Sequence, residues 1–183
     1  DTPMIWRGPM VTSALQQLLG ETDWGTLDYL VIDLPPGTGD IQLTLAQKVP
    51  VAGAVIVTTP QDIALLDARK ALQMFRKVRV PVLGLVENMS MHVCPECGHT
   101  EPLFGDGGGV AMAEEYEVPL LGRLPLSRPI REALDAGTPT VASAPESPEG
   151  QLFRACARRV AGELSQQPRS QSAGLPGIVV QNR

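Results

Sequence analysis

The residue types that could do chemistry in this 183-residue chain gather in two places. One of them is Asp33, which ends the apolar run Tyr29-Leu-Val-Ile and opens a Pro- and Gly-rich loop that reaches Asp40. Ligands of open parallel sheets bind where strands end, and a carboxylate at that position can hold the magnesium ion of a nucleotide. A buried strand that ends in a capping Asp and a Pro-Gly turn would give the same pattern.

The other place is Cys94-Pro-Glu-Cys97, whose C-x-x-C spacing lets two thiolates reach one metal centre. A redox pair is one interpretation, but such a pair usually begins a helix, and Gly98-His99-Thr100 is not a typical helix start. A zinc site completed by His92 and His99 is another, although four ligands within so short a segment would be crowded. In the third interpretation two copies of the loop supply four thiolates across a symmetric dimer, which suits an iron–sulphur cluster or zinc.

Three further features are weaker candidates. Asn88 ends another predicted strand, where its amide could contact a purine base. The glycines of residues 105–109 could offer backbone amides to an anion, although a flexible connection into the next helix explains them more simply. Cys156 lies four residues from both Leu152 and Val160 and is predicted to be an inert buried thiol.

Strands alternate with helices along the chain. The uninterrupted apolar run at residues 53–58 is typical of a strand that is covered on both faces. The alternation predicts an α/β fold with a mostly parallel sheet and helices on both faces. Residues 89–109, with two cysteines, both histidines and many glycines, have a different character. The patterns predict strands at 27–34, 53–58, 81–87 and 119–124. They predict helices at 8–20, 40–48, 62–78, 127–136 and 148–164, and a further short helix that ends at about residue 116.

Composition excludes several classes of protein. The contents of 43% hydrophobic and 19% charged residues are ordinary for a globular domain, and the net charge of -5 does not favour a nucleic-acid binder. No apolar run reaches the roughly 18 residues that a membrane helix needs, and no signal peptide is recognisable. Three cysteines do not form a disulfide framework, so we expect a cytoplasmic, reducing compartment. The Ser-, Gln-, Pro- and Gly-rich residues 165–183 are predicted to be a disordered tail.

Four motifs, in this order, resemble those of the Mrp/ApbC-type iron–sulphur cluster carrier ATPases. They are Asp33-Leu-Pro-Pro-Gly-Thr-Gly-Asp40, Thr58-Thr-Pro-Gln-Asp62, Glu87-Asn-Met-Ser90 and Cys94-x-x-Cys97. The resemblance runs from about Met4 to Ser147. These carriers belong to the deviant-Walker group of P-loop NTPases, with MinD, ParA and the nitrogenase iron protein as relatives. The C-x-x-C loop separates this branch from MinD and ParA.

The resemblance implies a role for each matching residue. Asp33 would be the Walker B carboxylate, which holds magnesium through water, and Asp33 and Asp40 would be the catalytic carboxylates. Cys94 and Cys97 would bind a [4Fe-4S] cluster that bridges two subunits. The implied switch loop consists of Pro36, Gly37, Thr38, Gly39 and Asp40, and the implied contacts to adenine are Asn88 with the nearby Pro125 and Leu126.

One departure from the family is important. The family's P-loop with its signature lysine is missing, because none of the three lysines, Lys48, Lys70 and Lys77, follows a glycine. We therefore expect residues 1–164 to be the C-terminal part of a P-loop ATPase domain, N-terminally incomplete, with the cysteine loop 89–109 inserted. We do not expect this chain to hydrolyse ATP alone. Loss of the first strand is expected to expose apolar surface on its neighbours.

The predicted function is that of a homodimeric iron–sulphur cluster carrier or scaffold that delivers a [4Fe-4S] cluster to apo-proteins. Binding and hydrolysis of ATP, with Mg²⁺, are expected in the full-length protein, and neither nucleic acid nor membrane is an expected partner. A MinD/ParA-like positioning ATPase is an alternative. Such a protein is expected to have a basic patch or an amphipathic C-terminal helix. The only basic residues in the tail after Leu164 are Arg169 and Arg183. A zinc-stabilised regulatory domain is another, but it leaves the segment from Asp33 to Asp40 unexplained.

Overall fold

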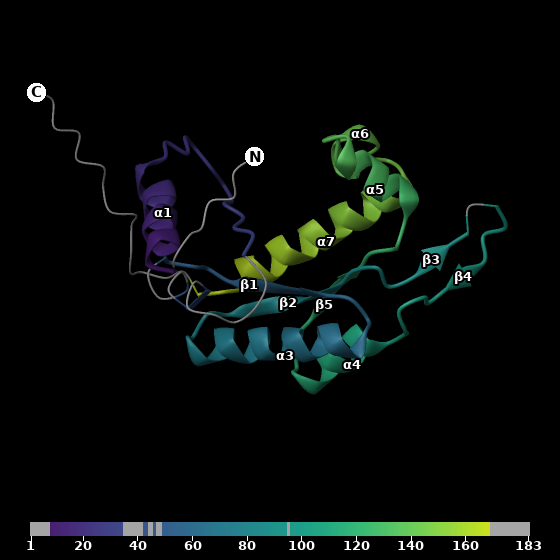
Figure 1. Ribbon diagram of the computed structural model, residues 1–183, viewed down its shortest axis with the longest axis horizontal. Helices are drawn as coiled ribbons and strands as arrows, with labels where there is room; N and C mark the ends of the chain where they lie inside the picture. Colours follow the sequence, from purple (N-terminus) through teal and green to yellow (C-terminus); the bar gives the residue numbers. More distant parts are fainter. Residues whose placement is uncertain (1–7, 35–41, 44–45, 47–48, 95, 169–183) are drawn as a thin grey trace, which may run out of the picture. The chain divides into compact units, whose positions relative to one another are not determined.

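The computed structural model describes residues 8–34, 42–43, 46, 49–94 and 96–168 (Figure 1). The chain divides into two compact units, one of which holds the described residues up to Val51 and the other Ala52–Pro168. In the first unit, α1 spans Gly8–Glu21, as its apolar spacing predicts. Beyond it the chain turns where the Gly25 N–H donates to Asp23 Oδ1 at 3.0 Å.

The strand predicted at 27–34 is wrong for this structure, because the described residues there form no strand. Most of their apolar side chains are exposed, and Val31 is 89% exposed. A strand is stabilised by the hydrogen bonds that it makes with a neighbour, and the described part of this unit contains no other strand to pair with. Most of the helix predicted at 40–48, the predicted switch loop 36–40 and the tail from 169 lie outside the described residues.

The second unit contains a three-stranded parallel sheet, which confirms the predicted fold class. Its strands are β1 (Ala54–Thr58), β2 (Val82–Glu87) and β5 (Leu120–Arg123), in the order β1-β2-β5. The strands lie within the three apolar runs that predicted them. Parallel neighbours need crossover connections, and α3 (Asp62–Lys77) and α4 (Gly108–Glu115) lie in these connections.

Helices cover both faces of this sheet (Figure 1). On one face lie α3 and α4; α3 directs Leu65, Ala68 and Leu72 into the core, and Leu72 is fully buried. On the other face lies α7 (Pro148–Ser165), whose first turn is capped where Ser147 Oγ accepts the Gly150 N–H at 3.0 Å. The core on the α7 side consists of Val86, Leu121 and Leu124, packed by Val55, Phe153, Cys156 and Val160.

Cys156 is therefore half-buried in this cluster rather than fully buried, and burial raises the pKa of its thiol. The predicted inertness of this thiol stays a prediction. Between β5 and α7 lie α5 (Arg128–Asp135), close to its predicted bounds, and the short α6 (Thr140–Ser143), which the patterns did not predict. Among the described residues no helix is both long and apolar enough to cross a membrane.

The segment of unusual composition between β2 and α4 forms a small antiparallel hairpin. Its strands are β3 (His92–Val93) and β4 (Thr100–Glu101), in which His92 pairs with Glu101 and Val93 with Thr100. The hairpin extends away from the parallel sheet (Figure 1). Cys94 and Cys97 lie between its two strands in the sequence. We call residues 89–107 the cysteine segment.

Candidate functional site: the sheet edge and the cysteine hairpin

The carboxyl ends of the three parallel strands form one edge of the sheet, where ligands of α/β folds bind. The Asn88 N–H donates to Thr58 O at 2.7 Å, and the Leu124 N–H donates to Glu87 O at 2.8 Å. These bonds bring the ends of β1, β2 and β5 together. Asn88, Pro125 and Leu126, which the sequence predicts to contact a base, therefore follow neighbouring strands at this edge.

Pairing between β2 and β5 continues beyond the ends of the strands. The Ser90 N–H donates to Leu124 O at 2.9 Å, and the Leu126 N–H donates to Met91 O at 2.8 Å. His92 and Leu126 then form a parallel bridge. The start of the cysteine segment thus runs beside residues 124–126.

The Asn88 side chain is held in one orientation. Its Oδ1 accepts the Met89 N–H at 2.9 Å, and Met89 adopts a positive φ of 55° at this bend. Within the described residues no partner engages the amide NH₂ group of Asn88, which is therefore the part that could donate to a ring nitrogen of a base. The contact of Asn88 with adenine stays a prediction.

The two cysteines lie in a tight turn. The Gly98 N–H donates to Cys94 O at 2.9 Å, and the Cys94 N–H donates to His99 O at 2.8 Å. Gly98 has a φ of +70°, a conformation that favours glycine, so the residue after Cys97 is matched to the turn. Cys97 is exposed and Cys94 is half-buried.

The turn lowers the pKa of the Cys94 thiol. The main causes are hydrogen bonds from the backbone N–H of Cys97 and then of Glu96, followed by the Cys97 thiol, while burial acts weakly in the opposite direction. Donors directed at a sulphur favour the thiolate, the form that binds a metal. Among the described residues, no set of three or more His, Cys, Asp and Glu side chains is placed to hold one metal ion.

The histidines of this segment have different environments. His92 Nδ1 lies 3.3 Å from Leu126 O; because a carbonyl only accepts, Nδ1 carries the proton in this hydrogen bond. His99 is exposed, and its carbonyl closes the cysteine turn. From the sequence, His92 was a candidate only as a zinc ligand, and its contact with Leu126 was not predicted.

Asp33 belongs to the other unit, where it is exposed and lies in no strand. The other members of the predicted magnesium and switch set, Pro36, Gly37, Thr38, Gly39 and Asp40, lie outside the described residues. The proposed roles of these residues therefore stay predictions.

An ion pair between a buried carboxylate and a half-buried guanidinium, which the sequence did not predict, lies at the same edge. Glu87 is fully buried; Arg123 Nε donates to its Oε1 at 2.8 Å, and the Gly109 N–H at the start of α4 donates to its Oε2 at 2.7 Å. Arg123 also donates to Asp106 Oδ1 at 2.9 Å, and these carboxylates, Glu87 first, raise the pKa of the Arg123 guanidinium. The sequence signal that could have predicted this pair is that Glu87 and Arg123 lie at or near the ends of two predicted strands.

This pair also bears on the glycines of residues 105–109. The carboxylate of Glu87 occupies the N-terminus of α4, where an external anion would have been expected to bind. The simpler interpretation, a connection into the helix, therefore agrees with the structure.

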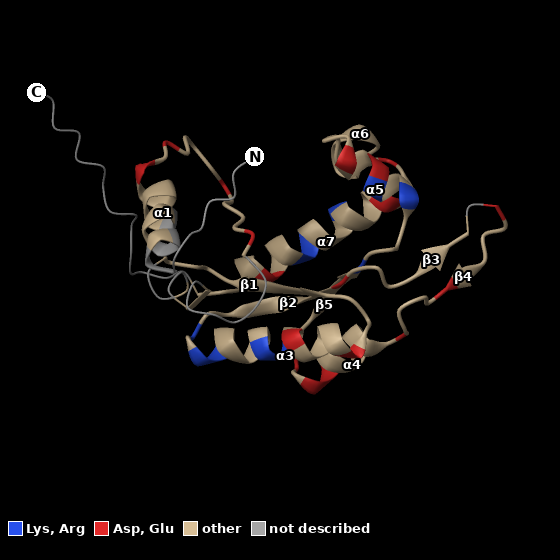
Figure 2. Cartoon of the chain, in the orientation of Figure 1, with Lys and Arg blue, Asp and Glu red and all other residues tan. Residues whose placement is uncertain are grey.

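The cysteine segment is also distinctive in charge. Residues 80–122 contain no Lys or Arg. In Figure 2 the hairpin carries acidic residues (red) and no basic ones, whereas basic residues (blue) occur on α3 and α7. The acidic residues of the cysteine segment are Glu96, Glu101 and Asp106.

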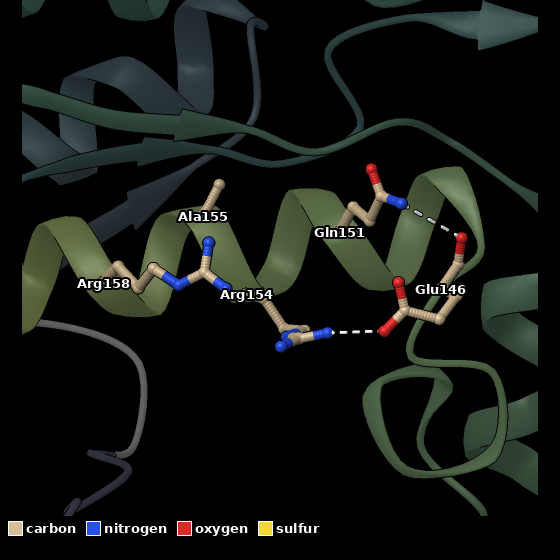
Figure 3. A pocket seen from close by; sticks show the side chains of 5 residues that line it. All are labelled: Glu146, Gln151, Arg154, Ala155 and Arg158. Carbon is tan, nitrogen blue, oxygen red and sulfur yellow. Dashed lines mark hydrogen bonds and ion pairs between the residues drawn. The ribbon is translucent and has the colours of Figure 1, made fainter.

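A separate hollow of about 390 Å³ lies along α7 (Figure 3). Within it Arg154 pairs with the Glu146 carboxylate at 2.9 Å, and Gln151 Nε2 donates to Glu146 O at 3.2 Å. Ala155 and Arg158 complete the lining, which includes none of the predicted site residues.

Comparison with known proteins shows the family of this chain. Residues 1–161 match the family described as ParA, NUBPL iron-transfer P-loop NTPase. A Salmonella typhimurium protein named "Iron-sulfur cluster carrier protein" is 63% identical over 164 residues, which cover 90% of this chain. Those residues make up 44% of that relative, so the chain spans less than half of its length.

Two solved structures are similar as well. A nucleotide-binding protein from Archaeoglobus fulgidus, solved in complex with ADP, superposes with a TM-score of 0.67 at 38% identity, covering 78% of this chain and 57% of that one. The septum site-determining protein MinD of Pyrococcus horikoshii, complexed with Mg-ADP, gives a TM-score of 0.60 at 26% identity, covering 85% and 58%.

Proposed function

Because the chain belongs to the ParA/NUBPL family of iron-transfer P-loop NTPases, we propose that the full-length protein carries a [4Fe-4S] cluster and delivers it to apo-proteins. The cluster is cargo in this proposal, held between two copies by Cys94 and Cys97 of each. ATP binding and hydrolysis in the full-length, cytoplasmic protein accompany the transfer.

The observation that carries the proposal is the cysteine turn. Two thiols lie on a hairpin that extends from the sheet, one of them exposed, and backbone N–H groups lower the pKa of the other. Four thiolates hold a [4Fe-4S] cluster, and one turn supplies two of them, so two copies complete the set. Exposure of the turn suits a carrier, since an incoming thiolate from a client must reach the cluster to displace Cys94 or Cys97.

The nucleotide side of the proposal is supported by the sheet edge. Asn88 would donate its amide NH₂ to a ring nitrogen of adenine, and Pro125 and Leu126 would pack beside the base. Asp33 and Asp40 would act on the phosphate side, with Asp33 holding Mg²⁺ through water. The structural similarity to an ADP-bound protein supports the location of this site at the ends of the strands.

The positioning ATPase stays the main alternative, because the chain has a MinD-like fold. It assigns no role, however, to the cysteine turn, in which backbone N–H groups lower the pKa of the Cys94 thiol.

The test is metal analysis of the full-length protein purified without oxygen. We expect about two irons and two acid-labile sulphides per chain, since a four-iron cluster is shared by two copies. A Cys94→Ser/Cys97→Ser variant should lose both elements, while the matched control Cys156→Ala should keep them, because that thiol lies in the core beside α7. Zinc without sulphide, or iron retained by the double variant, would contradict the proposal.

A further inference from the structure

We propose that residues 123–126 connect the nucleotide edge to the cysteine hairpin, with His92 and Asp106 as the positioning residues of that connection. The inference rests on the proposed function and concerns how the two sites affect one another. Its structural basis is that both arms of the cysteine segment are attached to this one stretch, which runs from Arg123, the last residue of β5, to Leu126.

The outgoing arm, residues 90–92, is attached by hydrogen bonds over its whole length. Both the N–H and the Oγ of Ser90 donate to Leu124 O, at 2.9 and 3.1 Å, and Ser90 is only 2% exposed. The Leu126 N–H donates to Met91 O, and His92 Nδ1–H donates to Leu126 O at 3.3 Å. This arm cannot slide past residues 124–126 without breaking buried or half-buried bonds.

The return arm is attached through Arg123. Its guanidinium reaches Glu87 with Nε and Asp106 with the terminal nitrogen, at 2.8 and 2.9 Å. Asp106 lies at the end of the cysteine segment, just before α4, whose Gly109 N–H is bound by the same Glu87. Displacement of residue 123 is thereby transmitted to the arm that leads back from Cys97.

The nucleotide side meets this stretch at Pro125 and Leu126. The carbonyls of residues 124 and 126, on either side of Pro125, are the acceptors for Ser90 and His92. A base that packs against Pro125 and shifts it moves both acceptors together. Two sites joined through such an element have a coupling free energy, and the coupling is reciprocal: the cluster must change nucleotide affinity as much as nucleotide changes cluster affinity.

Two side chains allow the connection to be cut without replacing a residue of either proposed site. His92→Phe keeps a planar ring but removes the donor to Leu126 O. Asp106→Asn removes the ion pair of an exposed carboxylate (63% exposed) while leaving the Arg123–Glu87 pair in place. His92→Asn keeps a donor near the Nδ1 position and serves as the conservative replacement. Glu101→Gln removes the same charge from exposed β4 and is the matched control.

The experiment uses the full-length protein under anaerobic conditions. Iron and sulphide are determined first for each variant; then the Kd for a fluorescent ADP is measured with and without the cluster. For the unmodified protein we expect the two Kd values to differ by about 5-fold or more, the lower end for coupled sites. For His92→Phe/Asp106→Asn we expect the ratio to fall below about 2-fold, with iron content and cluster-free Kd unchanged. His92→Asn and Glu101→Gln should keep the original ratio.

Each other outcome overturns the inference. A double variant that keeps the ratio shows that the coupling does not pass through these contacts, and equal Kd values in the unmodified protein show that no coupling exists; both leave the carrier proposal standing. A double variant that loses iron, or that binds nucleotide less tightly without cluster, shows that these residues belong to a site. Absence of iron from the unmodified protein refutes the carrier proposal and this inference with it.

Discussion

Cysteines in this chain acquire opposite properties from their surroundings. Cys94 accepts N–H groups in a turn, which lowers its pKa, whereas burial in the core beside α7 raises the pKa of Cys156. Both effects follow from whether the environment stabilises the thiolate or the neutral thiol. Hydrogen-bond donors therefore distinguish Cys94, the thiol proposed to bind the cluster, from the packing residue Cys156.

This difference predicts a pH dependence of alkylation. The thiolate is the reactive form, so a lowered pKa shifts the rise of the reaction rate of Cys94 to lower pH, and a raised pKa shifts that of Cys156 to higher pH. At neutral pH iodoacetamide should modify Cys94 several-fold faster than Cys156, as measured by mass spectrometry of the metal-free protein. Denaturant should remove the difference, and identical pH profiles in the folded protein would refute the assigned environments.

At the scale of elements, the ends of β2 and β5 and the start of α4 meet at Glu87. A buried carboxylate is tolerated because Arg123 and the Gly109 N–H both bind it. Space at this junction is limited: a Cβ at position 109 would lie 2.6 Å from Glu87 Oε2. The absence of a side chain there allows the helix N-terminus to approach the carboxylate.

Gly109→Ala should therefore reduce the free energy of unfolding by about 1–3 kcal/mol, the usual cost of overpacking a core position. Gly162→Ala on α7 is the matched control, since a Cβ there meets nothing within 4 Å. That substitution should stabilise the protein by about 0.4–1 kcal/mol, because it reduces the entropy of the unfolded chain. Urea unfolding of the metal-free protein measures both values, and equal effects at the two positions would contradict the packing described for Glu87.

At the scale of the molecule, the proposed function requires two copies of the chain to associate. The cysteine segment carries Glu96, Glu101 and Asp106 and no basic residue, so two hairpins that approach each other bring like charges together. Shared thiolate bonds to a cluster would have to offset this repulsion. The dimer of the proposed function is thus expected to depend on its cargo.

We accordingly expect the cluster-loaded full-length protein, without nucleotide, to be a dimer by anaerobic gel filtration with light scattering. Removal of iron by a chelator should give the monomer, and so should Cys94→Ser/Cys97→Ser. Raising the ionic strength should favour residual association of the metal-free protein, because screening weakens repulsion between exposed charges. A metal-free dimer of unchanged stability would place the interface elsewhere than the hairpins.

Local patterns in the sequence were sufficient for most elements of the second unit. Apolar runs predicted β1, β2 and β5, and helical spacing predicted α3 and α7, because burial of one face leaves a periodic signal in the chain itself. The prediction of a strand at 27–34 was wrong because a strand also needs a partner outside its own segment. Its apolar pattern is a local property, but a strand exists only when a neighbour completes its hydrogen bonds, and no local pattern records that neighbour.

The sequence by itself determined the chemistry that is available: a C-x-x-C pair followed by the glycine that its turn requires, and Asn88 at the end of a strand. Only the tertiary structure decided which groups act together. Glu87 and Arg123 are 36 residues apart, and His92 and Leu126 are 34 apart, yet parallel pairing of β2 with β5 places each pair in contact. Such contacts depend on which strands become neighbours, and strand order is set by packing of the whole sheet rather than by any one segment.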